Sequence, residues 1–119
     1  WSVLYNNVAY LNDNTAFEFQ LRTYPDTLKN NISYNNYDNE TTGTNDIHDH
    51  NSWDASPSVT LTDSDFLSVD TMELYLLRQA DGSLPDIDFM QLKSSSDLID
   101  AGIDVGINYG GLYPDIGSF

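Results

Sequence analysis

The sequence predicts an all-β protein in which short strands and turns stack as a parallel β-solenoid. Residues 4–10 (LYNNVAY) return 24 residues later as residues 28–34 (LKNNISY), and a weaker third copy (IHDHNSW) begins 19 residues further on, at Ile47. Each copy starts with an aliphatic residue, continues with mostly polar residues and ends with an aromatic residue. A period of this length is typical of stacked repeats, in which each coil contacts only its neighbours.

The composition restricts the class of protein. The chain has 119 residues, enough for one domain, and lacks cysteine, which excludes disulfides, zinc–thiolate sites and cysteine nucleophiles. It has 19 acidic and four basic residues, and the net charge of −15 disfavours nucleic acid, because phosphate binding needs Lys and Arg. Sixteen of the acids are Asp, which favours turns over helices, while eight Tyr, five Phe and two Trp supply a core. We therefore expect a folded chain.

A strand is expected between the first two copies of the motif. Residues 15–22 alternate apolar and polar side chains, which places Phe17, Phe19 and Leu21 on one side of an extended segment. The Tyr-Pro-Asp sequence at residues 24–26 then predicts a turn. The repeating unit is thus short strand, turn, short strand, turn.

The paired asparagines are expected at the bends between strands. The pairs are Asn6–Asn7 and Asn30–Asn31. Asn tolerates left-handed backbone angles, and its amide can satisfy backbone groups at a tight bend. Stacked at the same bend of successive coils, such amides can form a hydrogen-bonded ladder. The other interpretation is that these are ordinary surface-loop residues, but their register with the flanking aliphatic and aromatic residues favours the ladder.

The second half of the chain has a different rhythm. Residues 35–50 read as a polar loop with a short β-like segment at its end. After Pro57, the sequence predicts a brief strand at 58–61, a capped turn at 62–67, and a short helix or irregular edge at 71–80. We expect one domain, with its last coils in residues 1–56 and a fold-back cap in residues 57–119, because an open solenoid end exposes strand edges and core.

The C-terminal third carries a recognisable series of motifs. It reads SDLIDAG at residues 96–102, DVG at 104–106 and YPDIGSF at 113–119. Residues 29–35, 50–54, 65–70 and 78–85 fit the same pattern. Together they resemble the C-terminal part of bacterial pectate lyases of polysaccharide lyase family nine, the family that includes pectate lyase L. The resemblance implies the final coils of a right-handed parallel β-helix with an irregular C-terminal cap.

The resemblance also implies a function for the parent protein. It would be a secreted, periplasmic or outer-surface bacterial lyase that cleaves pectate or a related uronic-acid polysaccharide by β-elimination. A base removes the proton next to the uronate carboxyl while a cation neutralises that carboxylate. In this family, calcium is held by an aspartate cluster and the base is a lysine, both on earlier coils.

This chain shows no aspartate cluster followed by a Phe-Lys-Leu-Gly-like segment. We therefore expect a structural segment with no catalytic residue, inactive alone, whose open N-terminal end is covered by N-terminal β-helix coils or a second copy. The alternative is a non-catalytic glycan-binding or surface-adhesion module.

Few side chains are candidates for ligand contact. Arg22, Tyr24 and Lys29 could contact an acidic glycan, although Arg22 could instead pair with a neighbouring Asp, and Lys29 could be an ordinary surface lysine. His48 and His50 would share one face of a strand, but no third zinc ligand is evident unless Asp46 or Asp49 contributes. Residues 63–65 and 97–104 group oxygen ligands without a known calcium-loop pattern. The sequence therefore predicts no bound metal in this chain.

Overall fold

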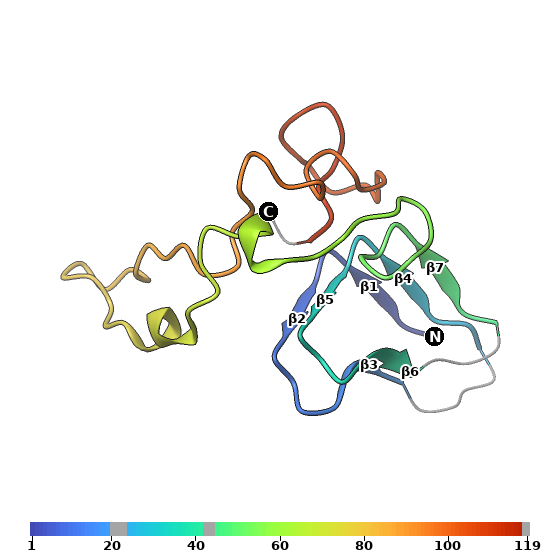
Figure 1. Cartoon of the computed structure of the whole chain (residues 1–119), viewed down its shortest axis with the longest axis horizontal. Helices are drawn as coiled ribbons and strands as arrows, with labels where there is room; N and C mark the ends of the chain where they lie inside the picture. The colour runs from blue at the N-terminus through green and yellow to red at the C-terminus, as the bar shows by residue number, and fades with distance from the viewer. Residues whose placement is uncertain (20–23, 42–44, 118–119) are drawn as a thin grey trace.

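The fold is an all-β parallel β-helix, as the sequence predicts. The computed structural model describes residues 1–19, 24–41 and 45–117. In that part of the chain, seven short strands form three parallel sheets on three sides of a coil, with strand orders β1-β4-β7, β2-β5 and β3-β6 (Figure 1). The strands are β1 (Val3–Tyr5), β2 (Val8–Tyr10), β3 (Thr15–Glu18), β4 (Thr27–Lys29), β5 (Ile32–Tyr34), β6 (Asp38–Thr41) and β7 (Ile47–Asp49).

The repeat in the sequence corresponds to one coil of this helix. The first coil holds β1, β2 and β3, the second holds β4, β5 and β6, and β7 begins a third. Leu4 pairs with Leu28, so the first two coils are 24 residues apart, as the motif predicts. Leu28 pairs with His48, however, so the next step is 20 residues and the predicted step of 19 is wrong. Backbone pairing places Asp49, rather than His48, beside Lys29.

The corners between strands explain the paired asparagines. Asn6, Asn30 and His50 occupy the same corner and have φ angles of 57°, 55° and 54°, the left-handed region that Asn adopts more readily than most residues. Leu11 and Asn35 repeat this conformation at the next corner, with φ angles of 57° and 54°. At each of these corners, one residue in the left-handed conformation changes the direction of the chain. The side chain of the next residue can then point along the axis on which the coils stack.

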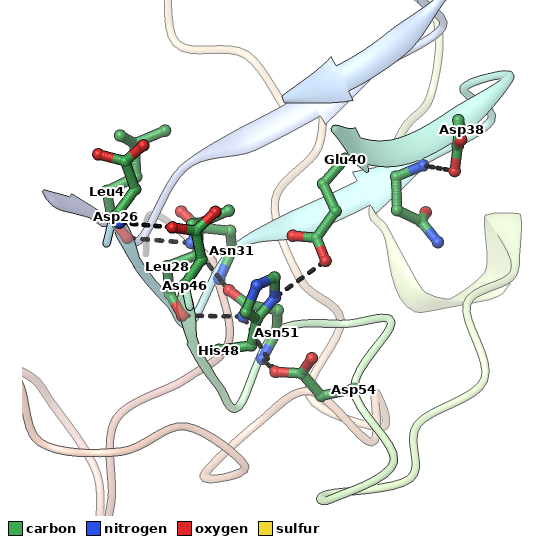
Figure 2. A network of polar contacts seen from close by, with 11 residues as sticks. Leu4, Asp26, Leu28, Asn31, Asp38, Glu40, Asp46, His48, Asn51 and Asp54 are labelled. Carbon is green, nitrogen blue, oxygen red and sulfur yellow. Dashed lines mark hydrogen bonds and ion pairs between the residues drawn. The ribbon is translucent and has the colours of Figure 1, made fainter. Parts of the chain in front are cut away.

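The second residue of each corner builds the ladder. The backbone N–H and side-chain Nδ2 of Asn7 donate to Asn31 Oδ1 at 3.0 and 3.1 Å. The same two groups of Asn31 donate to Asn51 Oδ1 at 3.0 and 2.8 Å, and those of Asn51 donate to Asp54 Oδ2 at 2.8 and 2.9 Å (Figure 2). The sequence does not predict a place for Asn51 in this ladder, because the repeat expected at Ile47 is one residue out of register with the observed pairing of Leu28 and His48.

The other two corners carry ladders of the same kind. Asn12 N donates to Asn36 Oδ1 at 2.8 Å, and Asn36 Nδ2 returns a bond to Ala9 O at 2.9 Å. Before β4 and β7, Asp26 N donates to Asp46 Oδ1 at 2.7 Å, and a carboxylate oxygen of Asp26 accepts from Ser2 N. Side-chain oxygens thus join successive coils at all three of these places among the described residues.

The third sheet departs from the prediction. β3 ends at Glu18, and the remainder of the predicted strand lies largely outside the described residues. β6, which the sequence predicted as polar loop, pairs in parallel with β3. Its polar residues form a strand because pairing with β3 satisfies the backbone, while the side chains of Asp38 and Asn39 remain exposed.

The cap contains no regular strand in its described residues, 57–117, so the predicted strand at 58–61 is wrong. The predicted capped turn is present as a 3-10 helix (Asp63–Asp65) in which Thr62 and Asp65 form a reciprocal capping box. A second 3-10 helix (Thr71–Tyr75) occupies part of the segment predicted as short helix or irregular edge. No helix in the described residues has the length and apolar character needed to cross a membrane.

Apolar contacts fix the cap to the coils. Side chains of β2 and β5 that point outward pack under cap residues, and the ring centroids of Tyr34 and Phe66 are 5.4 Å apart. The tail returns to the second coil, where Gly117 N donates to Asn30 O at 2.8 Å. The buried cluster that joins the two parts consists of Ile32, Phe66, Met90, Leu98 and Ile116.

Candidate functional site

The outer face of the β1-β4-β7 sheet is the first candidate surface. Side chains alternate along each strand, so buried Leu28 faces the interior and Lys29 faces outward. Parallel pairing aligns Tyr5, Lys29 and Asp49 in one row across the sheet. Lys29 Nζ lies 3.6 Å from Asp49 Oδ2, so a glycan carboxylate would have to compete with Asp49 for this ammonium.

The three predicted glycan contacts have different environments. Tyr24 precedes β4, and its side chain is free to meet a ligand because the residue is 67% exposed. Lys29 is partly buried and ion-paired, as described above. Arg22 lies outside the described residues. Of the three predicted contact residues, the structure thus describes Tyr24 and Lys29.

A polar pair lies inside the coil, between β6 of the second coil and β7 of the third. Phe17 of β3 pairs with Glu40 of β6. The same interior position therefore holds an aromatic ring in the first coil and a carboxylate in the second. Glu40 Oε1 lies 2.9 Å from His48 Nδ1, and both side chains are mostly buried (Figure 2). Burial raises the pKa of the Glu40 carboxyl above its ordinary value, and the facing His48 opposes that rise.

Trp53 covers this pair. Its ring lies 5.6 Å from that of Phe17, centroid to centroid. Trp53 Nε1 and Glu40 Oε2 are both buried, and neither has a hydrogen-bond partner among the residues that the structure describes. Sequence reasoning missed this cluster because Phe17, Glu40, His48 and Trp53 become neighbours only through the coil register.

The histidine zinc site that the sequence raised is not assembled. His48 faces Glu40, whereas His50 Nδ1 lies 2.6 Å from Asp49 Oδ1, so the two imidazoles have separate carboxylate partners. Within residues 1–19, 24–41 and 45–117, no three His, Asp or Glu side chains come together in a group that could hold a metal.

The oxygen-rich segments considered for calcium have structural partners instead. Asp65 Oδ2 accepts from Thr62, and Asp65 Oδ1 accepts from Ser96 Oγ at 3.0 Å. Asp63 accepts from the Tyr34 hydroxyl, and Asp97 accepts from Thr60 N. The described residues therefore do not fit the calcium site that the family resemblance implies for the parent enzyme.

Comparisons with known proteins place this geometry in context. No family model matches the chain. Over 70 residues, or 58% of its length, the chain is 41% identical to pectate lyase L of Dickeya dadantii (strain 3937), and the same identity and coverage hold for pectate lyase L of Dickeya chrysanthemi. The match spans only 16% of each of these relatives.

A solved structure extends the similarity to nearly the whole chain. The crystal structure of pectate lyase Pel9A matches 98% of this chain, and 29% of its own chain, with a TM-score of 0.80 and 33% sequence identity. The sequence match and the fold match thus point to the same type of protein. By sequence, the chain is similar to one part of pectate lyase L, and by sequence and fold it is similar to one part of pectate lyase Pel9A.

Proposed function

We propose that this chain completes and caps the β-helix of a secreted polysaccharide lyase that acts on pectate or a related uronic-acid glycan, and that the catalytic centre and its calcium lie on other coils. The observation that carries the proposal is the asymmetry of the stack. At one end, the Asn ladder finishes on Asp54 and the tail bonds to the second coil. At the other end, β1 and β2 are outer strands of their sheets among the described residues.

An activity assay tests whether this chain lacks the catalytic centre. The chain is incubated with polygalacturonate and calcium, and the absorbance of unsaturated uronate products is followed. We expect no product, because the described residues assemble no group of metal ligands and Lys29 is already paired with Asp49. Sustained product formation by these 119 residues would overturn the proposal.

A non-catalytic glycan-binding module is the second candidate. It is favoured by exposed tyrosines on the second coil, since Tyr24 is 67% and Tyr37 is 86% exposed. A tyrosine ring offers an apolar face and a polar tip, which suits a sugar ring. The charge of −15 opposes a polyanionic glycan, so such binding would depend on local cations such as Lys29.

Affinity electrophoresis in gels that contain polygalacturonate tests this second candidate. If Lys29 contacts the glycan, Lys29→Ala should weaken retardation by roughly two- to fivefold, the effect of one exposed ion pair. Lys93→Ala removes the same charge from the cap and should leave retardation unchanged. Equal effects of the two variants would show that net charge, and not a site at Lys29, governs migration.

A further inference from the structure

We infer that a cavity between the Asn6 corner and the loop of residues 103–113 binds one neutral sugar ring. The cavity has a volume of about 290 Å³, close to the lower limit of the range of about 300–1,000 Å³ that is usual for small-molecule sites. It lies away from the row of Lys29, so the inference does not rest on the proposed function. Polar and apolar side chains share its lining, among them Asn6, Asn108, Tyr109, Asp115, Val105 and Ile107.

The loop that forms one wall of the cavity is fixed at its ends. Gly102 N donates to Pro114 O at 2.7 Å, so the two ends of the loop lie side by side. Asp100 Oδ1 accepts from Leu112 N and Tyr113 N at 3.0 and 2.9 Å. Compact loops whose ends meet often carry function, and a wall that is fixed before binding reduces the entropy lost when a ligand binds.

The corner of the second coil shows what an asparagine side chain can do at this position. Asn30 Nδ2 donates to Ile103 O at 2.8 Å, and Asn30 Oδ1 accepts from Ile103 N at 2.8 Å. Asn6 occupies the same corner one coil earlier, with a φ angle of 57° against 55° for Asn30. An amide at this corner can therefore bind a donor and an acceptor that lie next to each other.

The amide of Asn6 has no partner of this kind. Asn6 lines the cavity, and its Oδ1 is buried without a hydrogen-bond partner among the residues that the structure describes. An unpaired buried oxygen is unfavourable, so a ligand that pairs with it gains affinity. The last side-chain torsion of asparagine is soft, so the amide can turn to present Oδ1 or Nδ2 to that ligand.

The other lining groups indicate the class of ligand. Tyr109 is 44% exposed, and its ring offers an apolar face against which a sugar ring can lie. Asp115 Oδ1 accepts from Asp100 N at 2.7 Å, so a ligand hydroxyl would meet Oδ2. Each hydroxyl of a sugar both donates and accepts, which matches an amide and a carboxylate in the same cavity.

Charge favours a neutral sugar over an acidic one. Among the described residues that line the cavity, none is Lys, Arg or His, whereas Asp115 is acidic. The chain as a whole has a net charge of −15. A uronate in the cavity would meet this negative field without a neighbouring cation. The ligand of this cavity thus differs from the acidic glycan considered for Lys29.

NMR titrations of the full chain with D-galactose and D-galacturonate test the inference, because the two sugars differ only at C6. D-glucose and D-mannose cover other arrangements of the hydroxyls. We expect at least one neutral hexose to shift the amide signals of Asn6 and residues 103–109, with a Kd on the order of 1 mM. Galacturonate should bind at least about fivefold more weakly than that hexose.

Two variants and two matched controls locate the site. Asn6→Gly and Tyr109→Ala should each weaken binding of that hexose about fivefold or more. Asn35→Gly is the control for the first, because Asn35 has a φ of 54° at another corner and does not line the cavity. Glycine adopts this conformation without strain, so both glycine variants keep the backbone. Tyr75→Ala is the second control, since Tyr75 is 77% exposed in the cap.

The same titrations can contradict the inference. No shift near Asn6 with any of the three neutral hexoses at up to about 0.1 M would overturn it. Tighter binding of galacturonate, or equal weakening by the variants and their controls, would also overturn it. N-acetylglycine N-methylamide tests for a peptide. If this amide shifts Asn6 and no hexose does, the cavity receives a main chain, as Asn30 does, and the sugar assignment is wrong.

Discussion

A carboxylate inside a protein loses hydration, which nearby charges and hydrogen bonds replace only in part. Glu40 is in this situation, because Oε1 has His48 as its partner while Oε2 is buried without one among the described residues. Desolvation raises its pKa, His48 and the indole of Trp53 oppose the rise, and Asp54 and Asp46 add to it. Folding thus favours the neutral form of the Glu40 carboxyl over the charged form.

This preference sets the direction of a pH effect. Because the folded-state pKa of Glu40 is raised, the folded chain binds this proton more tightly, and stability from this group increases as the pH falls through that pKa. We expect the free energy of unfolding of the natural chain, relative to Glu40→Gln, to rise as the pH is lowered from neutral toward about 4. Urea titrations at several pH values measure this difference.

Glu18→Gln provides the control for the pH series. Glu18 lies on β3 of the same sheet but is exposed, so its substitution should give no comparable trend. If the relative stability of the natural chain fell on acidification, the ion pair with His48 would outweigh desolvation, and the interpretation of the interior pair would be wrong.

At the scale of the structural element, the corner is the unit that aligns one strand with the next. Asn31 is fully buried and receives two hydrogen bonds from Asn7 on its oxygen. Its Nδ2 donates to Leu4 O and to Asn51 Oδ1, at 3.0 and 2.8 Å. A single amide therefore connects three coils.

Asn31→Ala should lower the free energy of unfolding by about 2–3 kcal/mol, because it leaves buried polar groups without partners. Asn31→Asp should be at least as damaging, since it keeps the acceptor but brings a carboxylate against Asn51 Oδ1. Asn39→Ala is the control, because Asn39 is exposed on β6, and its effect should be within about 0.5 kcal/mol. Urea unfolding followed by circular dichroism measures all three, and equal losses at positions 31 and 39 would refute the ladder's importance.

The same elements show how much the sequence could predict. The strands β1, β2, β4 and β5 were predictable, because residues 4–10 and 28–34 repeat the pattern of an aliphatic residue, two asparagines and an aromatic residue. β6 was not, since Asp38, Asn39 and Glu40 have side chains typical of a loop, and only pairing with β3 makes them a strand. The strand expected at 58–61 failed for the opposite reason, because its apolar side chains pack in the cap without a partner strand.

The candidate site was less predictable than the fold. An error of one residue in the third repeat placed His48 beside Lys29, and so concealed the Lys29–Asp49 ion pair and the place of Asn51 in the ladder. The Glu40–His48 pair joins two different sheets, and no local pattern in the sequence encodes such a contact. Contacts between coils depend on the length of every intervening loop, which motif spacing gives only approximately.

At the scale of the whole molecule, one close approach holds the tail in the cap. Gly102 N donates to Pro114 O at 2.7 Å. A Cβ atom on Gly102 would lie 2.7 Å from Asp115 O and 2.9 Å from Pro114 O, both rigid backbone atoms. The return of the tail to the coils therefore requires glycine at this position.

Gly102→Ala should lower the free energy of unfolding by about 1–3 kcal/mol through this overlap. Gly110→Ala is the matched control, because a Cβ atom there meets nothing within 4 Å. Chemical unfolding of the two variants under the same conditions measures the difference. Comparable stabilities would mean that the tail can move aside, and that it contributes little to closing the stack.

The ladder also gives the molecule a sense of direction. The side chains of Asn31 and Asn51 both accept and donate in the ladder, and that of Asn7 donates, so an asparagine can be followed by another of its kind. Asp54, as a carboxylate, accepts both bonds from Asn51 and has no proton to pass on. The row of side-chain hydrogen bonds between asparagines therefore ends at Asp54. The ladder therefore ends in a residue that can only accept, and an asparagine at position 54 would restore a side-chain donor there.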